Sequence, residues 1–291
     1  MIYSLSGTSI NSAYEIDSNE IDFAYDLSGA TVFERINPYE YYSISQIYNK
    51  SRDYSQGMDI YGNYMVIFRD SDHCFLFVNM TTWEIDYTVS TDVNEHGNDI
   101  SFSKAFYDTE DEFPLLFLNG QRSKGLRIDI NNLTATTIKT INATPTGSTW
   151  VVYGIAFNDD MTRYYTLGYN TNNYSDSSGF IFLETWDISE SLENPTRLDS
   201  VIRAWFPCIQ GMQYHDGLLW VASGMGDPVK VFALDLSDAS IVKTVDLTRT
   251  GELEGIGWGY DQDTDKYFCV YGQVYNGITY YRIDFSPIPI S

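Results

Sequence analysis

Residues 56–60 read Gln56-Gly57-Met58-Asp59-Ile60, and recognisable versions of this stretch return four more times toward the C-terminus. The pattern is a polar residue or tyrosine, then glycine or aspartate, then an aliphatic residue; we name it the marker. Each copy opens a run with the composition of a β-strand. The later copies are Asn98-Asp99-Ile100-Ser101-Phe102, Tyr153-Gly154-Ile155-Ala156-Phe157, Gln210-Gly211-Met212-Gln213-Tyr214 and Glu254-Gly255-Ile256-Gly257-Trp258.

The spacing of the marker predicts the fold. Measured at Gly57, Asp99, Gly154, Gly211 and Gly255, the copies lie 42, 55, 57 and 44 residues apart. A blade of a β-propeller, which is a sheet of four short strands, takes roughly 40 to 50 residues. The repeat therefore predicts an all-β fold, a five-bladed β-propeller over residues 36–291.

The last unit is one strand short, because it ends after a strand at 279–285 and a short tail. Residues 40–48 resemble the outer strands expected at 138–141 and 198–202. We expect this N-terminal strand to complete the last blade and close the ring, which removes the open sheet edges.

Residues 1–35 carry a separate eleven-residue period that starts at Tyr3, Tyr14 and Tyr25. Each unit contains turn-forming residues, which predicts short strands joined by tight turns. Such a segment has too little apolar surface to fold alone. We interpret it as a β leader or attachment segment that docks on the main domain, on a second copy or on a larger assembly.

Charge and cysteine content exclude several classes of partner and site. Seventeen Lys and Arg stand against forty Asp and Glu, a formal net charge of −23 that repels nucleic acid and anionic membranes. Cys74, Cys208 and Cys269 lack metal-ligand spacing, so we expect free, buried thiols, no metal and no cofactor. No signal peptide is visible at the start, and no run approaches the length of a membrane span.

One end of the propeller axis is the predicted ligand site. There the loops into the inner strands meet those that join the second and third strands. The residue before each marker glycine would form a polar ring beside His96, although such amides can also simply bond backbone and water. Aromatic rings in the entry loops suit stacking on a sugar, or packing between blades. The candidate ligand-binding residues are Gln56, His96, Asn98, Tyr153, Gln210, Glu254, Tyr54, Trp150, Trp205 and Phe206.

Catalytic motifs are scarce. His73, His96 and His215 are the three histidines, and no GxSxG nucleophile elbow accompanies them. The acidic run 261–265 starts like a calcium loop but has Lys266 and Gly272 where glycine and glutamate are needed. We interpret it as a turn.

An aspartate or asparagine recurs near the end of the third strand of each unit, where its side chain can bond amides of the following turn. These residues are Asn79, Asp129, Asp187, Asp235 and Asp284. A structural role explains them.

Short motifs resemble known families. Gln56-Gly57-Met58 and Gln210-Gly211-Met212, with residues 96–102 and 111–116, resemble the five-bladed propellers of helveticin-like bacteriocins and of phage tail receptor-binding proteins. That resemblance spans most of residues 40–285 and implies non-catalytic recognition of a cell-wall glycopolymer. The blade opening at 56–63 also resembles plant-type glutaminyl cyclase, which implies proton transfer by Glu254 at a desolvated channel mouth.

The leading hypothesis is a non-catalytic carbohydrate-binding module, not an enzyme, located in a virion tail or outside the cell. Its expected partner is a cell-surface saccharide. The hypothesis also allows contacts with other tail proteins through residues 1–35, and it allows the protein to form a homo-oligomer. Two alternatives stay open: a glutaminyl-cyclase-like enzyme using Glu254 and His96, and a structural spacer in a larger particle.

Overall fold

The computed structural model describes residues 38–50, 55–94, 96–97, 99–119, 123–142, 151–169, 180–204, 208–226, 229–247, 251–274 and 277–287. The chain divides into two compact units, Met1–Ser43 with Phe285–Ser291, and Ile44–Asp284. In the first unit, the ring of Tyr39 lies edge-on to Phe285 with centroids 5.3 Å apart. The predicted leader, residues 1–35, lies outside the described residues.

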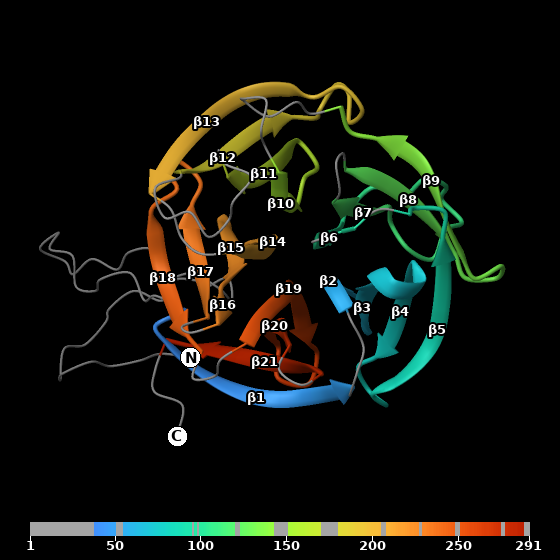
Figure 1. Cartoon of the computed structure of the whole chain (residues 1–291), viewed down its shortest axis with the longest axis horizontal. Helices are drawn as coiled ribbons and strands as arrows, with labels where there is room; N and C mark the ends of the chain where they lie inside the picture. Colours follow the sequence, from blue (N-terminus) through green and yellow to red (C-terminus); the bar gives the residue numbers. More distant parts are fainter. Residues whose placement is uncertain are drawn as a thin grey trace, which may run out of the picture. The chain divides into compact units, whose positions relative to one another are not determined.

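The regular secondary structure of the described residues is almost entirely β-strand, which confirms the all-β prediction (Figure 1). Within them η1 (Asp70–Asp72) is a single turn of 3-10 helix, and no helix has the length and apolar character needed to cross a bilayer. The strands are β1 (Tyr41–Lys50), β2 (Ser55–Tyr61), β3 (Tyr64–Arg69), β4 (Cys74–Asn79), β5 (Glu84–Thr91), β6 (Asp99–Phe102), β7 (Leu116–Asn119), β8 (Lys124–Asp129), β9 (Thr134–Thr140), β10 (Val151–Phe157), β11 (Arg163–Tyr169), β12 (Phe180–Asp187), β13 (Thr196–Ala204), β14 (Ile209–His215), β15 (Leu218–Ser223), β16 (Met225–Gly226), β17 (Lys230–Asp235), β18 (Ile241–Asp246), β19 (Gly251–Asp261), β20 (Lys266–Val274) and β21 (Ile278–Ser286).

The strands form sheets built from antiparallel neighbours. Two sheets have four strands each, in the orders β10-β11-β12-β13 and β14-β15-β17-β18, and a third has the order β1-β21-β20-β19-β16. The eight-stranded sheet, β2-β3-β4-β5-β9-β8-β7-β6, contains two antiparallel sets of four. These sets meet through a short parallel pairing, Ser90 with Thr134 and Thr91 with Ala135. Because this sheet is continuous, the count of five blades stays a prediction.

The marker copies lie in the innermost strands. Within Ile44–Asp284, strands β2, β6, β10, β14 and β19 lie nearest the centre, and each contacts the next in turn (Figure 1). Close approach of these strands explains the glycines. A Cβ on Gly57 would lie 2.5 Å from Cα of Asp99, and one on Gly211 would lie 2.7 Å from Cα of Gly255. No side chain fits at such a separation, so the marker glycine is required by the packing of neighbouring strands.

Asp99 replaces the glycine in the second copy and ties three inner strands together. Its carboxylate is fully buried, and its Oδ2 accepts hydrogen bonds from the backbone N–H of Ile155 in β10 and of Met212 in β14, each 3.0 Å long. Burial raises the pKa of Asp99 well above its ordinary value, against the opposing effect of these two bonds. The odd residue of the repeat is therefore a buried acceptor shared by strands distant in sequence.

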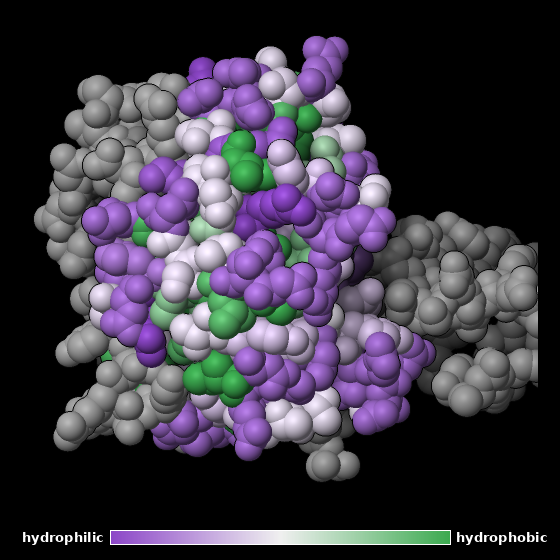
Figure 2. Space-filling model, turned by 90° about the vertical axis from the view of Figure 1, so that its right-hand side faces the viewer, coloured by the Kyte–Doolittle hydropathy of each residue, from purple (hydrophilic) through white to green (hydrophobic). Residues whose placement is uncertain are grey.

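Apolar clusters lie between neighbouring four-stranded sets. Phe77 and Leu116 belong to one cluster, between the two sets of the eight-stranded sheet, and Leu183 and Leu219 belong to another. Outer strand β5 alternates exposed and half-buried residues, as expected for a strand with one face in water. Figure 2 shows mainly hydrophilic residues on the face that it presents, with apolar residues in small groups among them.

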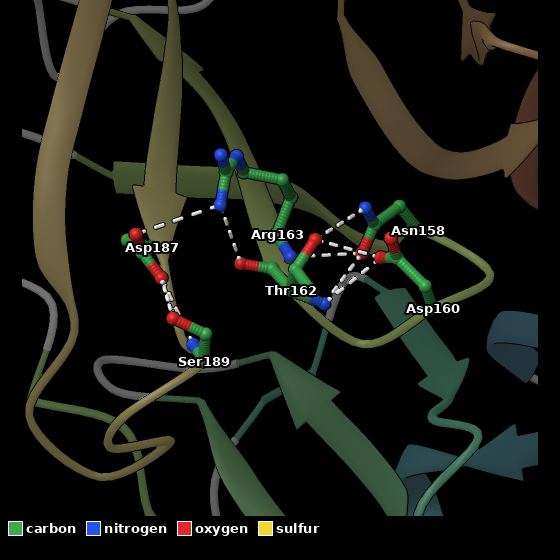
Figure 3. A network of polar contacts seen from close by, with 6 residues as sticks. All are labelled: Asn158, Asp160, Thr162, Arg163, Asp187 and Ser189. Carbon is green, nitrogen blue, oxygen red and sulfur yellow. Dashed lines mark hydrogen bonds and ion pairs between the residues drawn. The ribbon is translucent and has the colours of Figure 1, made fainter.

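The recurrent aspartate and asparagine residues bond the turns, as predicted, in four of the five units. In each of these an Oδ1 accepts from a backbone N–H two or three residues later, and Figure 3 shows the Asp187–Ser189 example, where Asp187 also pairs with Arg163 at 3.5 Å. Asp284 instead accepts from Nε of Arg282 at 2.7 Å. The other turn bonds are Asn79 to Thr81, Asp129 to Asn132 and Asp235 to Ser237. The three cysteines are free and buried, which confirms that prediction as well.

Candidate functional site

Five polar side chains from four segments of the chain lie in the region where the inner strands begin. Asp70 lies in η1 between β3 and β4, His96 precedes β6, Gln210 lies in β14, and Glu252 and Glu254 lie in β19. His96 Nδ1 lies 2.9 Å from Asp70 Oδ2, and Gln210 Nε2 donates to Glu252 Oε1. We name this set the mouth cluster.

Glu254 is the most deeply buried member of the mouth cluster. The residue is 3% exposed, and its Oε2 has no hydrogen-bond partner among the residues that the structure describes. Burial raises the pKa of Glu254 well above its ordinary value, and the nearby charges of Glu252 and Asp70 raise it further. A carboxyl in this environment holds its proton at a higher pH than an exposed glutamate does.

Glu252 stands two residues earlier on the same strand and is half-buried. Burial raises the pKa of Glu252, whereas the hydrogen bond from Gln210 and the charge of His96 lower it. The mouth cluster therefore holds two carboxyls of different environment, the arrangement that separates acid and base roles in many enzymes.

Cys208, which immediately precedes β14, is not a candidate for a catalytic nucleophile. Burial, with the charges of Glu252 and Glu254, raises the pKa of its thiol to about 12. A thiol with that pKa is protonated at neutral pH and is a weak nucleophile. Among the described residues, no group of three or more His, Cys, Asp or Glu side chains is arranged to hold a metal ion.

The structure brings together three of the residues that the sequence selected. Gln210 and Glu254 are buried, His96 is exposed, and Gln56 is half-buried at the start of β2. Tyr153 lies in β10, where only its backbone is described. The remaining candidates lie outside the described residues: Tyr54, Asn98, Trp150, Trp205 and Phe206.

Sequence reasoning missed Asp70 and Glu252. Residues at positions i and i+2 of a strand share a face, so the alternation Glu252-Leu253-Glu254 was a usable signal. Asp70 lies in the connection between the second and third strands of its set, which is one of the two loop types expected to build the mouth. Asp70 and His96 are 26 residues apart in the sequence, and no local pattern indicates that they pair.

The comparisons with known proteins bear on the fold. No protein-family model matches the chain, and no curated protein sequence is similar to it. The structure of Myxococcus xanthus glutaminyl cyclase is similar, with a TM-score of 0.52 and 10% sequence identity over 85% of this chain and 97% of that one. The PQQ-bound aldose sugar dehydrogenase of Streptomyces coelicolor gives a TM-score of 0.49 and 10% identity, over 85% of this chain and 100% of that one. At such identities the likeness shows the fold, which is of the β-propeller type.

The prediction of a non-catalytic carbohydrate-binding module without enzymatic activity is wrong. The finding against it is that a solved structure with this fold, the Myxococcus xanthus protein, is an enzyme. The prediction rested on the scarcity of catalytic motifs along the sequence. Proton transfer needs no such motif, because a buried carboxyl and its neighbours can be assembled from distant segments, as Glu254 and Asp70 are.

Proposed function

We propose that this chain is a five-bladed β-propeller enzyme of the glutaminyl cyclase type, with its active site at the mouth cluster. The substrate would be a peptide with N-terminal glutamine, and the products a pyroglutamyl peptide and ammonia. The observation that carries the proposal is the carboxyl of Glu254, buried beside polar groups and with Oε2 lacking a partner among the described residues. The closed succession of contacts between β2, β6, β10, β14 and β19 supports five blades.

The reaction is an intramolecular acyl transfer. The α-amino nitrogen attacks the carbon of the side-chain amide, a C–N bond forms, and the bond to the amide nitrogen breaks. One proton must leave the attacking nitrogen, and one must reach the departing nitrogen so that it leaves as ammonia. No oxidant or cofactor is needed for this balance.

Glu254 can move both protons. A carboxyl that keeps its proton donates it to the departing nitrogen through one oxygen, while the other oxygen accepts the proton of the α-amine. The raised pKa of Glu254 favours the protonated starting form. The hydrogen bond from Gln210 holds Glu252 in place beside it, which keeps the electrostatic environment of Glu254 fixed.

The test is ammonia release from a glutaminyl peptide by the wild type and by Glu254→Gln. The variant keeps the size of the side chain but cannot relay a proton, so we expect a loss of kcat of about 100- to 10,000-fold. Glu84→Gln, on outer strand β5 and exposed, is the matched control and should keep the wild-type rate. Turnover that survives Glu254→Gln would rule out this residue as the proton carrier, and a wild type inactive on every glutaminyl peptide would overturn the proposed function.

A further inference from the structure

The acidic side chains of the mouth cluster differ in exposure. Glu254 is 3% exposed, Glu252 is half-buried, and the side chain of Asp70 is 29% exposed. Glu252 stands two residues before Glu254 on β19, and the charges of Glu252 and Asp70 both raise the pKa of Glu254. The two more exposed acids, Glu252 and Asp70, therefore add negative charge beside the buried carboxyl of Glu254.

Two basic side chains beside these acids, within the part of the chain that the structure describes, are already paired. Arg69 forms an ion pair with Asp72, and His96 contacts Asp70 at 2.9 Å. Oε2 of Glu254 has no hydrogen-bond partner among the described residues, which marks this carboxyl as the place where a ligand group would be received. The net charge of −23 adds a long-range field of the same sign.

We propose that this site selects peptides in which a basic residue follows the N-terminal glutamine, with Glu252 and Asp70 as the specificity-determining residues. The inference rests on the proposed function. When the N-terminal residue of a peptide is bound at Glu254, the rest of the peptide extends toward solvent past Glu252 and Asp70, which are more exposed. The side chain of its second residue therefore lies within the electric field of these two acids. Lysine or arginine there gains a charge interaction, and glutamate is repelled.

The experiment compares kcat/KM for peptides beginning Gln-Lys, Gln-Ala and Gln-Glu. A partly exposed charge pair changes kcat/KM roughly twofold to fivefold, so we expect the order Lys, Ala, Glu with steps of about that size, shrinking as salt is raised. Glu252→Gln should reduce the Lys-to-Glu ratio by roughly one such step. Glu84→Gln, an exposed acid on β5, should leave the ratio unchanged.

The outcomes separate the two proposals. Equal kcat/KM for the three peptides in an active wild type overturns the selectivity and leaves the proposed function standing. Absence of turnover with every peptide overturns the proposed function. Calorimetric titration of the same three peptides then decides the selectivity by affinity alone, since equal or absent binding of the lysine and glutamate peptides refutes it.

Discussion

Asp99 allows the sharpest test of how the centre of the propeller is held together. Four copies of the marker have glycine at this position, so the repeat would suggest that Asp99→Gly is harmless. The structure predicts the opposite, because Oδ2 of Asp99 is the acceptor for the amides of Ile155 and Met212. Removing it leaves two buried N–H groups without that acceptor.

The matched variant is Asp99→Asn. Both amides bond the same oxygen, Oδ2, while Oδ1 has no hydrogen-bond partner among the described residues, so an asparagine carbonyl oxygen in the place of Oδ2 keeps both bonds. Neither variant titrates, so their difference in stability does not depend on the raised pKa of the native carboxyl. That difference reports the loss of the acceptor and the backbone freedom of glycine, reduced by the cost of burying the amide NH2 group of asparagine in the place of Oδ1.

The expected magnitude follows from the two bonds. Each buried amide left unsatisfied costs about 1–3 kcal/mol, and glycine in a strand adds up to about 1 kcal/mol. Asp99→Gly should therefore be less stable than Asp99→Asn by about 2–7 kcal/mol in the free energy of unfolding. Urea unfolding followed by both tryptophan fluorescence and circular dichroism measures this and checks that one transition is observed. Equal stability of the two variants, within about 1 kcal/mol, would refute the role of the shared acceptor.

Two further predictions concern the same central region. Burial raises the pKa of Asp59 to about 7, so the folded state binds this proton more tightly than the unfolded state. The stability contributed by this group is greatest below about pH 4 and falls by up to roughly 4 kcal/mol as pH rises from about 4 to about 7. Asp59→Asn should flatten that slope between about pH 4 and about pH 7 in denaturant midpoints, and an unchanged slope would contradict the assignment. Gly57→Ala should lower the unfolding free energy by about 1–3 kcal/mol or more, because its Cβ would lie 2.5 Å from Cα of Asp99; a wild-type melting temperature in this variant would show that the strands approach less closely.

Local chemistry made much of the fold readable from the sequence. Strand-forming residues, turn residues and the recurrent Asx positions act over a few residues, so the strands and the bonds from Asn79 and Asp187 followed directly. The marker correctly identified the inner strands, because glycine is needed wherever their backbones nearly touch. The strand at 40–48 was also recognised, and β1 is next to β21 in its sheet.

The candidate site was only partly predictable. Gln210, His96 and Glu254 were selected because they precede or accompany the marker, which is a local pattern. Asp70 and Glu252 were missed, since their relation to Glu254 is a matter of charges acting between segments far apart in sequence. The non-catalytic interpretation failed for the same reason, because the scarcity of motifs along the chain says little about groups that only the fold assembles.

The sequence by itself determined that the fold is an all-β repeat and where its inner strands begin, because periodicity and turn chemistry are properties of neighbouring residues. Only the tertiary structure decided what the exceptional residues do. Asp99 became the acceptor shared by β10 and β14, and Glu254 became a carboxyl that holds its proton, because burial and the surrounding charges exist only once the inner strands have come together.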